Sequence, residues 1–169
     1  MIVVGGRTCR CGNHGCLEAY VGAPGIIQTL TENDPHSPLL FTEDQTRSIA
    51  AIATAATKGD LMAKAVVHQT SVYLSAGLSS LINIINPEQV ILGSWVADLL
   101  GPVMLPDLLD LIEQQSLAQP YKTVQFTLSE MKRNPVSLGA ATLVLEEFLA
   151  SAGRQAVAVR SEGFPTVKT

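Results

Sequence analysis

The stretch of this chain that decides its fold lies near the start and reads Cys9-Arg10-Cys11-Gly12-Asn13-His14-Gly15-Cys16-Leu17-Glu18. All three cysteines of the protein fall inside it. Glycines stand between the cysteines, which suits a tight loop, because glycine adopts backbone angles that a side chain disfavours. Three thiols at this spacing are typical of a metal site, since zinc prefers thiolate sulfur held on short loops. The alternative is three free, reduced cysteines.

The composition favours one compact domain. The 169 residues are 47% apolar and only 15% charged, which predicts a real core and an apolar surface for either a partner or a missing part of the protein. We expect a homo-oligomer. No apolar run is long enough for a membrane span and the N-terminus does not resemble a signal peptide, so we expect a cytoplasmic protein. A net charge of −4 with scattered basic residues argues against direct nucleic-acid binding.

The order of helix and strand patterns predicts an α/β layer architecture. A strand end at residues 2–4 and a capping box formed by Thr42 and Gln45 are expected near the start of the chain. The remaining expected elements are helices over 17–30 (irregular in its first half because of Gly22 and Pro24), 45–59, 60–86, 96–115 (interrupted at Gly101-Pro102 and Pro106) and 135–150, strands over 89–92 and 124–128, and a loose tail over 151–169.

The cysteine stretch resembles the zinc signature of the ROK family (repressors, open reading frames and sugar kinases). Residues 82–93, which read INIINPEQVILG, and Leu138-Gly139-Ala140-Ala141 resemble two later segments of the same family. The resemblance covers about residues 1–150. It implies an actin-like, ribonuclease-H-like fold, of which this chain is the back half of the larger lobe, an incomplete sheet flanked by helices. Residues 1–150 are then the C-terminal portion of a ROK domain, with its zinc loop at 9–16.

The same resemblance places several functional parts upstream of the matching segments. In the family, a Glu-x-Gly-His segment before the cysteines supplies the fourth zinc ligand and touches the sugar. The catalytic Asp, the phosphate-binding lobe and the helix-turn-helix of the repressors also lie upstream. We therefore expect a C-terminal fragment, or a truncated reading frame that starts at an internal Met, which does not phosphorylate a sugar by itself.

The resemblance also assigns the candidate site residues. Cys9, Cys11 and Cys16 are the ligands of a closed, structural zinc site, while His14 is a nearby substitute expected to face solvent. Glu18 matches a family glutamate that accepts hydrogen bonds from sugar hydroxyls. Its alternative interpretation is a solvated glutamate at a helix N-terminus, which the helix dipole favours.

Gly93-Ser94-Trp95 departs from the pattern of the ROK kinases. There, consecutive glycines after the matching strand let the backbone approach the nucleotide. Here Trp95 either fills the space of an adenosine or packs on the long helix, and in both cases ATP binding is in doubt. His36 and His68 are expected at the surface, and the apolar stripe of the long helix (Met62, Val66 and Tyr73 among others) is expected in the core or in a dimer contact.

Our first hypothesis is the C-terminal, sugar-sensing portion of a ROK transcriptional repressor, which binds a sugar or sugar phosphate. DNA is then bound only through a module that is absent from this chain, and no membrane is involved. The second hypothesis is the matching part of a glucokinase-like ROK sugar kinase that uses ATP and magnesium. A third is a scaffold fragment with no activity of its own.

Overall fold

The computed structural model describes residues 1–129 and 135–151, which belong to two compact units divided after Glu130. Each unit is described on its own. The predicted tail over 151–169 lies outside the described residues except for Ser151.

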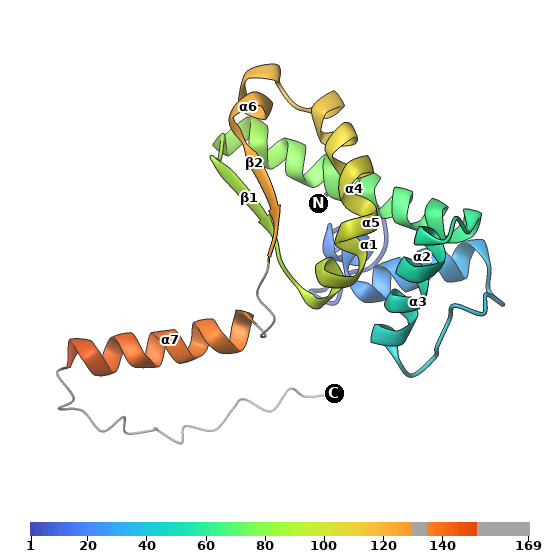
Figure 1. Cartoon of the computed structure of the whole chain (residues 1–169), viewed down its shortest axis with the longest axis horizontal. Helices are drawn as coiled ribbons and strands as arrows, with labels where there is room; N and C mark the ends of the chain where they lie inside the picture. Colours follow the sequence, from blue (N-terminus) through green and yellow to red (C-terminus); the bar gives the residue numbers. More distant parts are fainter. Residues whose placement is uncertain (130–134, 152–169) are drawn as a thin grey trace. The chain divides into compact units, whose positions relative to one another are not determined.

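The first unit consists of helices and a small parallel sheet that lies at one edge of the unit (Figure 1). Its elements are α1 (Glu18–Val21), α2 (Ala23–Asn33), α3 (Gln45–Thr57), α4 (Leu61–Ile85), β1 (Gln89–Leu92), α5 (Trp95–Gln115), α6 (Ala118–Thr123) and β2 (Gln125–Leu128). The two strands pair in parallel from Gln89↔Gln125 to Leu92↔Leu128, and α5 and α6 form the crossover between them, as parallel pairing requires. This arrangement confirms the predicted α/β class with an incomplete sheet. The second unit contains α7 (Pro135–Ala150), with the predicted bounds.

The long helix α4 is the centre of the first unit. The Asp60 side chain caps it by accepting a hydrogen bond from the backbone N–H of Ala63 (2.8 Å), and Asn86 ends it in the left-handed conformation (φ 50°). Val66 and Ile82 on its inner face are fully buried against α3 and α5. The predicted core position of the apolar stripe is therefore confirmed for Val66. Met62 is partly buried and packs against that core.

One face of the sheet joins this core. Val90 is buried and Leu92 and Phe126 pack against the core cluster, whereas Gln89 and Ile91 are exposed. The alternation follows from the two-residue period of a strand. The loop after β1 lies at a cavity that is also lined by the start of α2 and the middle of α4.

The predicted interruption of the 96–115 helix is wrong, because α5 continues through Pro102 and Pro106. A proline removes one helical hydrogen bond and bends the helix without having to end it. Burial of Leu100, Leu108 and Ile112 holds the helix together, and Gly101 leaves room for Leu128, from which an added Cβ would lie only 2.7 Å away.

Four further predictions near the N-terminal half and the sheet need correction. Residues 2–4 form no strand; the N–H groups of Ile2 and Val3 instead both donate to the carbonyl of Gly15. The expected irregularity in the first half of the 17–30 helix is a full break at the extended Gly22, which divides the helix into α1 and α2. Asp44, and not Thr42, caps α3, accepting from the N–H of Arg47 (2.9 Å). The short helix α6 was not expected.

Within the described residues, none of the helices has the length and apolar character that crossing a membrane demands.

Candidate functional site

The cysteine loop is closed by its own backbone. The N–H of Cys9 donates to the carbonyl of Asn13 (2.8 Å), and that of Gly12 donates back to Cys9 (2.9 Å). Gly12 and Gly15 both have positive φ. At Gly15 an added Cβ would collide with the carbonyl oxygen of Val3, so only glycine fits at this position.

This loop brings the three predicted metal ligands together. The Sγ atoms of Cys9, Cys11 and Cys16 all lie within 4.8 Å of one another, and those of Cys11 and Cys16 are 3.7 Å apart. Tetrahedral zinc with bonds of about 2.3 Å places two sulfur ligands about 3.8 Å apart. Cys9 is buried and Cys11 exposed, so an ion here has one protected and one open side. The thiols therefore fit a metal ion in both chemistry and spacing.

Two of the thiols differ strongly in acidity. The backbone N–H of Asn13, helped by the neighbouring thiols of Cys9 and Cys16, lowers the pKa of Cys11 to about 7. Its hydrogen bond with Cys11, together with partial burial, raises the pKa of Cys16 to about 11. Cys11 therefore ionises readily, and its thiolate then opposes the ionisation of Cys16. A bound cation removes this conflict, because it stabilises several thiolates at once.

The fourth ligand is not supplied by the nearby histidine. His14 is exposed, and its Nδ1 lies 3.4 Å from the hydroxyl of Thr8. In the part of the chain that the structure describes, no histidine or carboxylate joins the three thiols. The expectation that His14 faces solvent agrees with this geometry.

Arg7 anchors the loop to α2, a role that the sequence did not reveal. Its guanidinium donates to the carbonyl of Gly25 (3.0 Å) and to the hydroxyl of Thr29 (3.1 Å), and it forms an ion pair with Glu32. Its side chain is only 12% exposed. A single arginine in a polar loop gives no pattern that predicts such partners, which come from a helix 18 or more positions away.

The anchoring continues through aromatic contacts to the long helix. The Arg7 guanidinium lies over the ring of Tyr20 (4.9 Å), whose hydroxyl accepts a hydrogen bond from the Arg7 N–H (2.9 Å). The ring of Tyr20 in turn contacts that of Tyr73 on α4, with centroids 4.2 Å apart. The loop is therefore fixed to α1, α2 and α4 together.

Glu18 begins α1, directly after the loop. Its carboxylate lines a cavity of about 580 Å³ and lies 3.6 Å from the guanidinium of Arg10, with about half of its side chain exposed. Gly22 leaves space for it, since a Cβ there would come within 2.9 Å of Glu18 Oε1. The carboxylate is thus both at a helix start and at a cavity, and the sugar contact stays a prediction.

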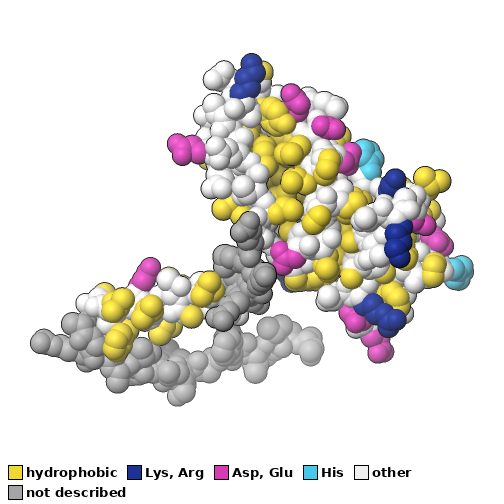
Figure 2. Space-filling view, in the orientation of Figure 1, with side chains coloured by type: hydrophobic (Ala, Val, Ile, Leu, Met, Phe, Trp, Pro, Cys, Tyr) yellow, Lys and Arg dark blue, Asp and Glu magenta, His cyan; other side chains and the backbone are white. Residues whose placement is uncertain are grey.

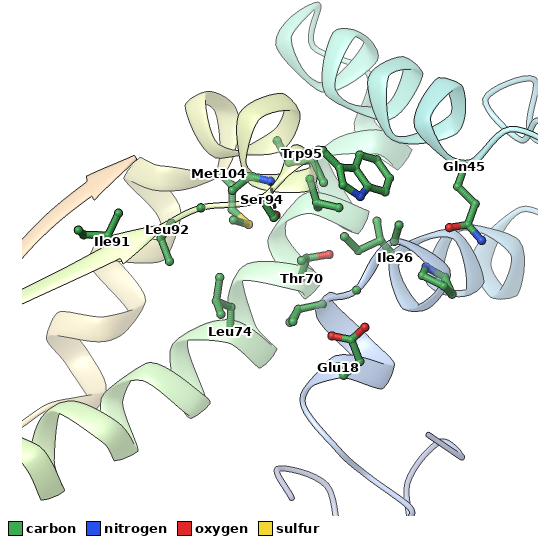
Figure 3. Close-up of a pocket in the computed structure, with 18 of the residues that line it drawn as sticks. Glu18, Ile26, Gln45, Thr70, Leu74, Ile91, Leu92, Ser94, Trp95 and Met104 are labelled. Atoms are coloured by element: carbon green, nitrogen blue, oxygen red, sulfur yellow. Dashed lines mark hydrogen bonds between the residues drawn. The ribbon is translucent and has the colours of Figure 1, made fainter. Parts of the chain in front are cut away.

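The cavity is bounded by α1, α2, α4, the end of β1 and the start of α5 (Figure 3). Trp95, the first residue of α5, is 43% exposed and lines it together with Thr70 of α4 and Ile26 of α2. Ser94 caps α5 by accepting from the N–H of Ala97 (3.1 Å). Trp95 therefore shares a cavity wall with the long helix.

The remaining histidines lie away from this cavity. His68 on α4 is exposed and its Nδ1 is 3.0 Å from the carboxylate of Asp107 on α5. His36 is exposed in the loop after α2, where its N–H donates to the side chain of Asp34 (3.2 Å). Both positions agree with the expected surface location.

Comparisons with known proteins agree with the resemblance of the cysteine loop. The sequence pattern of the ROK family matches residues 2–147. The DNA-binding transcriptional repressor Mlc of Escherichia coli (strain K12) is 30% identical over 139 residues, which cover 80% of this chain and 33% of Mlc. A glucokinase of Halalkalibacterium halodurans is 28% identical over 87% of this chain and 46% of its own length.

A solved structure shows the same fold. The ROK hexokinase of Thermus thermophilus superposes with a TM-score of 0.66 at 25% identity, over 86% of this chain and 46% of the hexokinase. The chain thus spans between a third and a half of the length of these relatives.

Proposed function

The chain belongs to the ROK family, and on that premise we propose that it is the C-terminal, sugar-sensing portion of a ROK transcriptional repressor. Residues 1–150 form this portion of the ROK domain. Because the chain spans only a third of Mlc, the DNA-binding part of such a repressor is assigned to residues other than these.

Trp95 is the observation that carries this proposal. A ROK kinase needs glycines after the strand so that its backbone can approach the nucleotide. Here Gly93 is followed by Ser94, whose hydroxyl caps α5, and by an indole at the cavity wall. This arrangement supports a member of the family that senses a ligand without transferring phosphate.

Glu18 is the proposed sugar contact. An ionised carboxylate offers two acceptor oxygens, which suits the vicinal hydroxyls of a sugar or sugar phosphate. The carboxylate lies at a cavity that is open enough to admit a ligand, and Gln45, Thr70 and Ser94 add further polar side chains to its walls.

Zinc is the proposed metal of Cys9, Cys11 and Cys16, with a fourth ligand from outside the described residues. A closed tetrahedral site cross-links the loop and does not activate water. Since Glu18 follows Cys16 by two positions, the metal holds the start of α1 in place.

We also propose that the protein is a homo-oligomer. Ile84, Ile85 and Ile91 are 82%, 66% and 59% exposed, more apolar surface than an isolated domain usually leaves uncovered. Figure 2 shows apolar side chains gathered on one face of the first unit, with charged side chains around them. A monomer mass at all protein concentrations in light scattering would contradict the proposed homo-oligomer.

The alternative is the corresponding part of a ROK sugar kinase, which the similarity to a glucokinase and a hexokinase favours. The test that separates the two is the genomic DNA upstream of Met1. A helix-turn-helix there supports the repressor, and a phosphate loop refutes it in favour of the kinase. The purified 169-residue chain should show no sugar-dependent ATP hydrolysis in either case, because the resemblance places the catalytic Asp of the kinases upstream; turnover by this chain alone refutes the repressor proposal.

A further inference from the structure

The cavity beside Glu18 is larger than one sugar ring needs. Its volume of about 580 Å³ lies in the range of about 300–1,000 Å³ that is usual for sites of drug-sized ligands. All of its walls belong to the first unit, so its size does not depend on how the two units are arranged.

The two ends of this cavity differ in chemistry. Glu18 provides a carboxylate at one end, and the fully buried Ile26 and Leu100 provide an apolar wall. Trp95 adds the flat face of an indole, 43% of which is exposed. In the view of Figure 3, Glu18 and Trp95 lie on either side of Ile26 and Thr70.

The charges at the cavity argue against a phosphorylated second group. Arg10 and Glu18 are its charged lining residues, and they are paired with each other at 3.6 Å. At the start of α5, Ser94 already satisfies two backbone donors, since its hydroxyl accepts from Ala97 and its carbonyl from Asp98 (2.9 Å). Among the described residues that line the cavity there is therefore no cluster of unpaired cationic side chains of the kind that binds several phosphates.

We propose that this cavity binds a sugar joined to a second, uncharged ring, with the sugar hydroxyls on Glu18 and the second ring on the face of Trp95. The inference rests on the proposed sugar-sensing function and names the class of ligand that it senses. A disaccharide and an aryl glycoside share this chemistry, because both present a flat, partly apolar ring beside a hydroxylated one. Indole favours such flat partners.

The test uses calorimetric titration of the full chain with a set of monosaccharides, each paired with its phenyl glycoside and its β-1,4-linked disaccharide. We expect at least one two-ring ligand to bind about three- to tenfold more tightly than its monosaccharide, which is the range for one aromatic contact. Trp95 is the single tryptophan of the protein, so its fluorescence should change with the two-ring ligand.

Variants separate stacking from general packing. Trp95→Leu should remove the two-ring advantage, whereas Trp95→Phe should retain part of it. Leu117→Ala, at an apolar side chain that is 61% exposed and away from the cavity, should change neither affinity. Circular dichroism melting shows whether each variant folds. If Trp95→Leu does not fold, the comparison of Trp95→Phe with the wild-type chain provides the test.

The failures of the two proposals are distinguishable. Monosaccharide binding that Glu18→Gln abolishes, with no two-ring advantage, overturns this inference and leaves the sugar-sensing function standing. An advantage that survives in both Trp95 variants also overturns it. Binding of ATP or adenosine in place of all sugars overturns both proposals. The absence of binding by every sugar tested overturns this inference, whereas the proposed function also relies on the family's upstream sugar contacts.

Discussion

Replacing Arg7 tests the anchoring of the cysteine loop. Arg7→Met keeps the aliphatic stem but removes the hydrogen bonds to the Gly25 carbonyl and the Thr29 hydroxyl, the contact with the Tyr20 ring and the ion pair with Glu32. A hydrogen bond from a charged donor contributes about 1.5 kcal/mol and a cation–π contact about 0.5–1 kcal/mol. The ion pair adds little, because Glu32 is 51% exposed.

We therefore expect Arg7→Met to lower the free energy of unfolding by about 3 kcal/mol, rather than by the full cost of two orphaned acceptors. The cost stays moderate because the Thr29 hydroxyl also donates to the Gly25 carbonyl (3.0 Å), so these groups partly satisfy each other after the substitution. Arg7→Lys should recover only part of the loss, since an ammonium group cannot reach the same set of partners as a planar guanidinium.

The assay is urea unfolding followed by the fluorescence of Trp95, which reports on the first unit. Arg10→Met is the matched control, because Arg10 lies in the same loop but is 87% exposed, and we expect a change below about 0.5 kcal/mol. Equal losses in the two variants, or no loss in Arg7→Met, would show that Arg7 does not anchor the loop.

Three further predictions address the core, the pH dependence and the metal. Ile82→Ala in α4 should lower the free energy of unfolding by about 2–5 kcal/mol, because Ile82 is fully buried. Ile84→Ala, at an 82% exposed isoleucine of the same helix, should lower it by less than about 0.5 kcal/mol. Similar losses for the two variants in urea unfolding contradict the packing of α4. Burial raises the pKa of Glu32, but hydrogen bonds from Arg7 and Gln28 outweigh it and lower the pKa below 4.5. Wild-type protein should therefore be more stable than Glu32→Gln by at most about 1 kcal/mol, in full above about pH 4.5, and this difference should disappear as the pH falls through the lowered pKa. A stability difference that increases as the pH falls contradicts the prediction. Zinc should protect all three thiols from a thiol reagent, and Cys11→Ser should weaken cobalt binding, followed by its thiolate absorption bands, at least about tenfold; unchanged affinity excludes Cys11 as a ligand.

The sequence predicted most of the fold where apolar periodicity and local chemistry act together. The bounds of the 89–92 strand and of the 135–150 helix agree with the structure, and α4 is one long helix as its pattern indicates. The continuity of α5 could not be predicted, because the packing that keeps Pro102 and Pro106 inside a helix comes from residues distant in sequence. The cap of α3 was misplaced by two residues, since Thr42 and Asp44 both precede the helix and only the backbone path selects one of them.

The proximity of the three cysteines was predictable from the sequence, but the contacts that support their loop were not. Cysteine spacing alone brought Cys9, Cys11 and Cys16 together, because so short a loop leaves the thiols little room to separate. Arg7, by contrast, acts through Tyr20, Gly25 and Thr29, whose proximity exists only after α1 and α2 have packed. The cavity that joins Glu18 to Trp95 likewise depends on α1 meeting the start of α5, which are far apart in the chain.

The central claim is that Glu18 binds a sugar, and calorimetric titration of the chain with a sugar panel tests it most directly. We expect at least one sugar or sugar phosphate to bind, and we expect Glu18→Gln to weaken that binding at least about tenfold, because the amide loses one acceptor oxygen and the charge that strengthens both hydrogen bonds. Glu88→Gln, at an exposed glutamate outside the cavity, should leave the affinity unchanged. Equal sugar affinity in the wild-type chain and in Glu18→Gln would contradict the account.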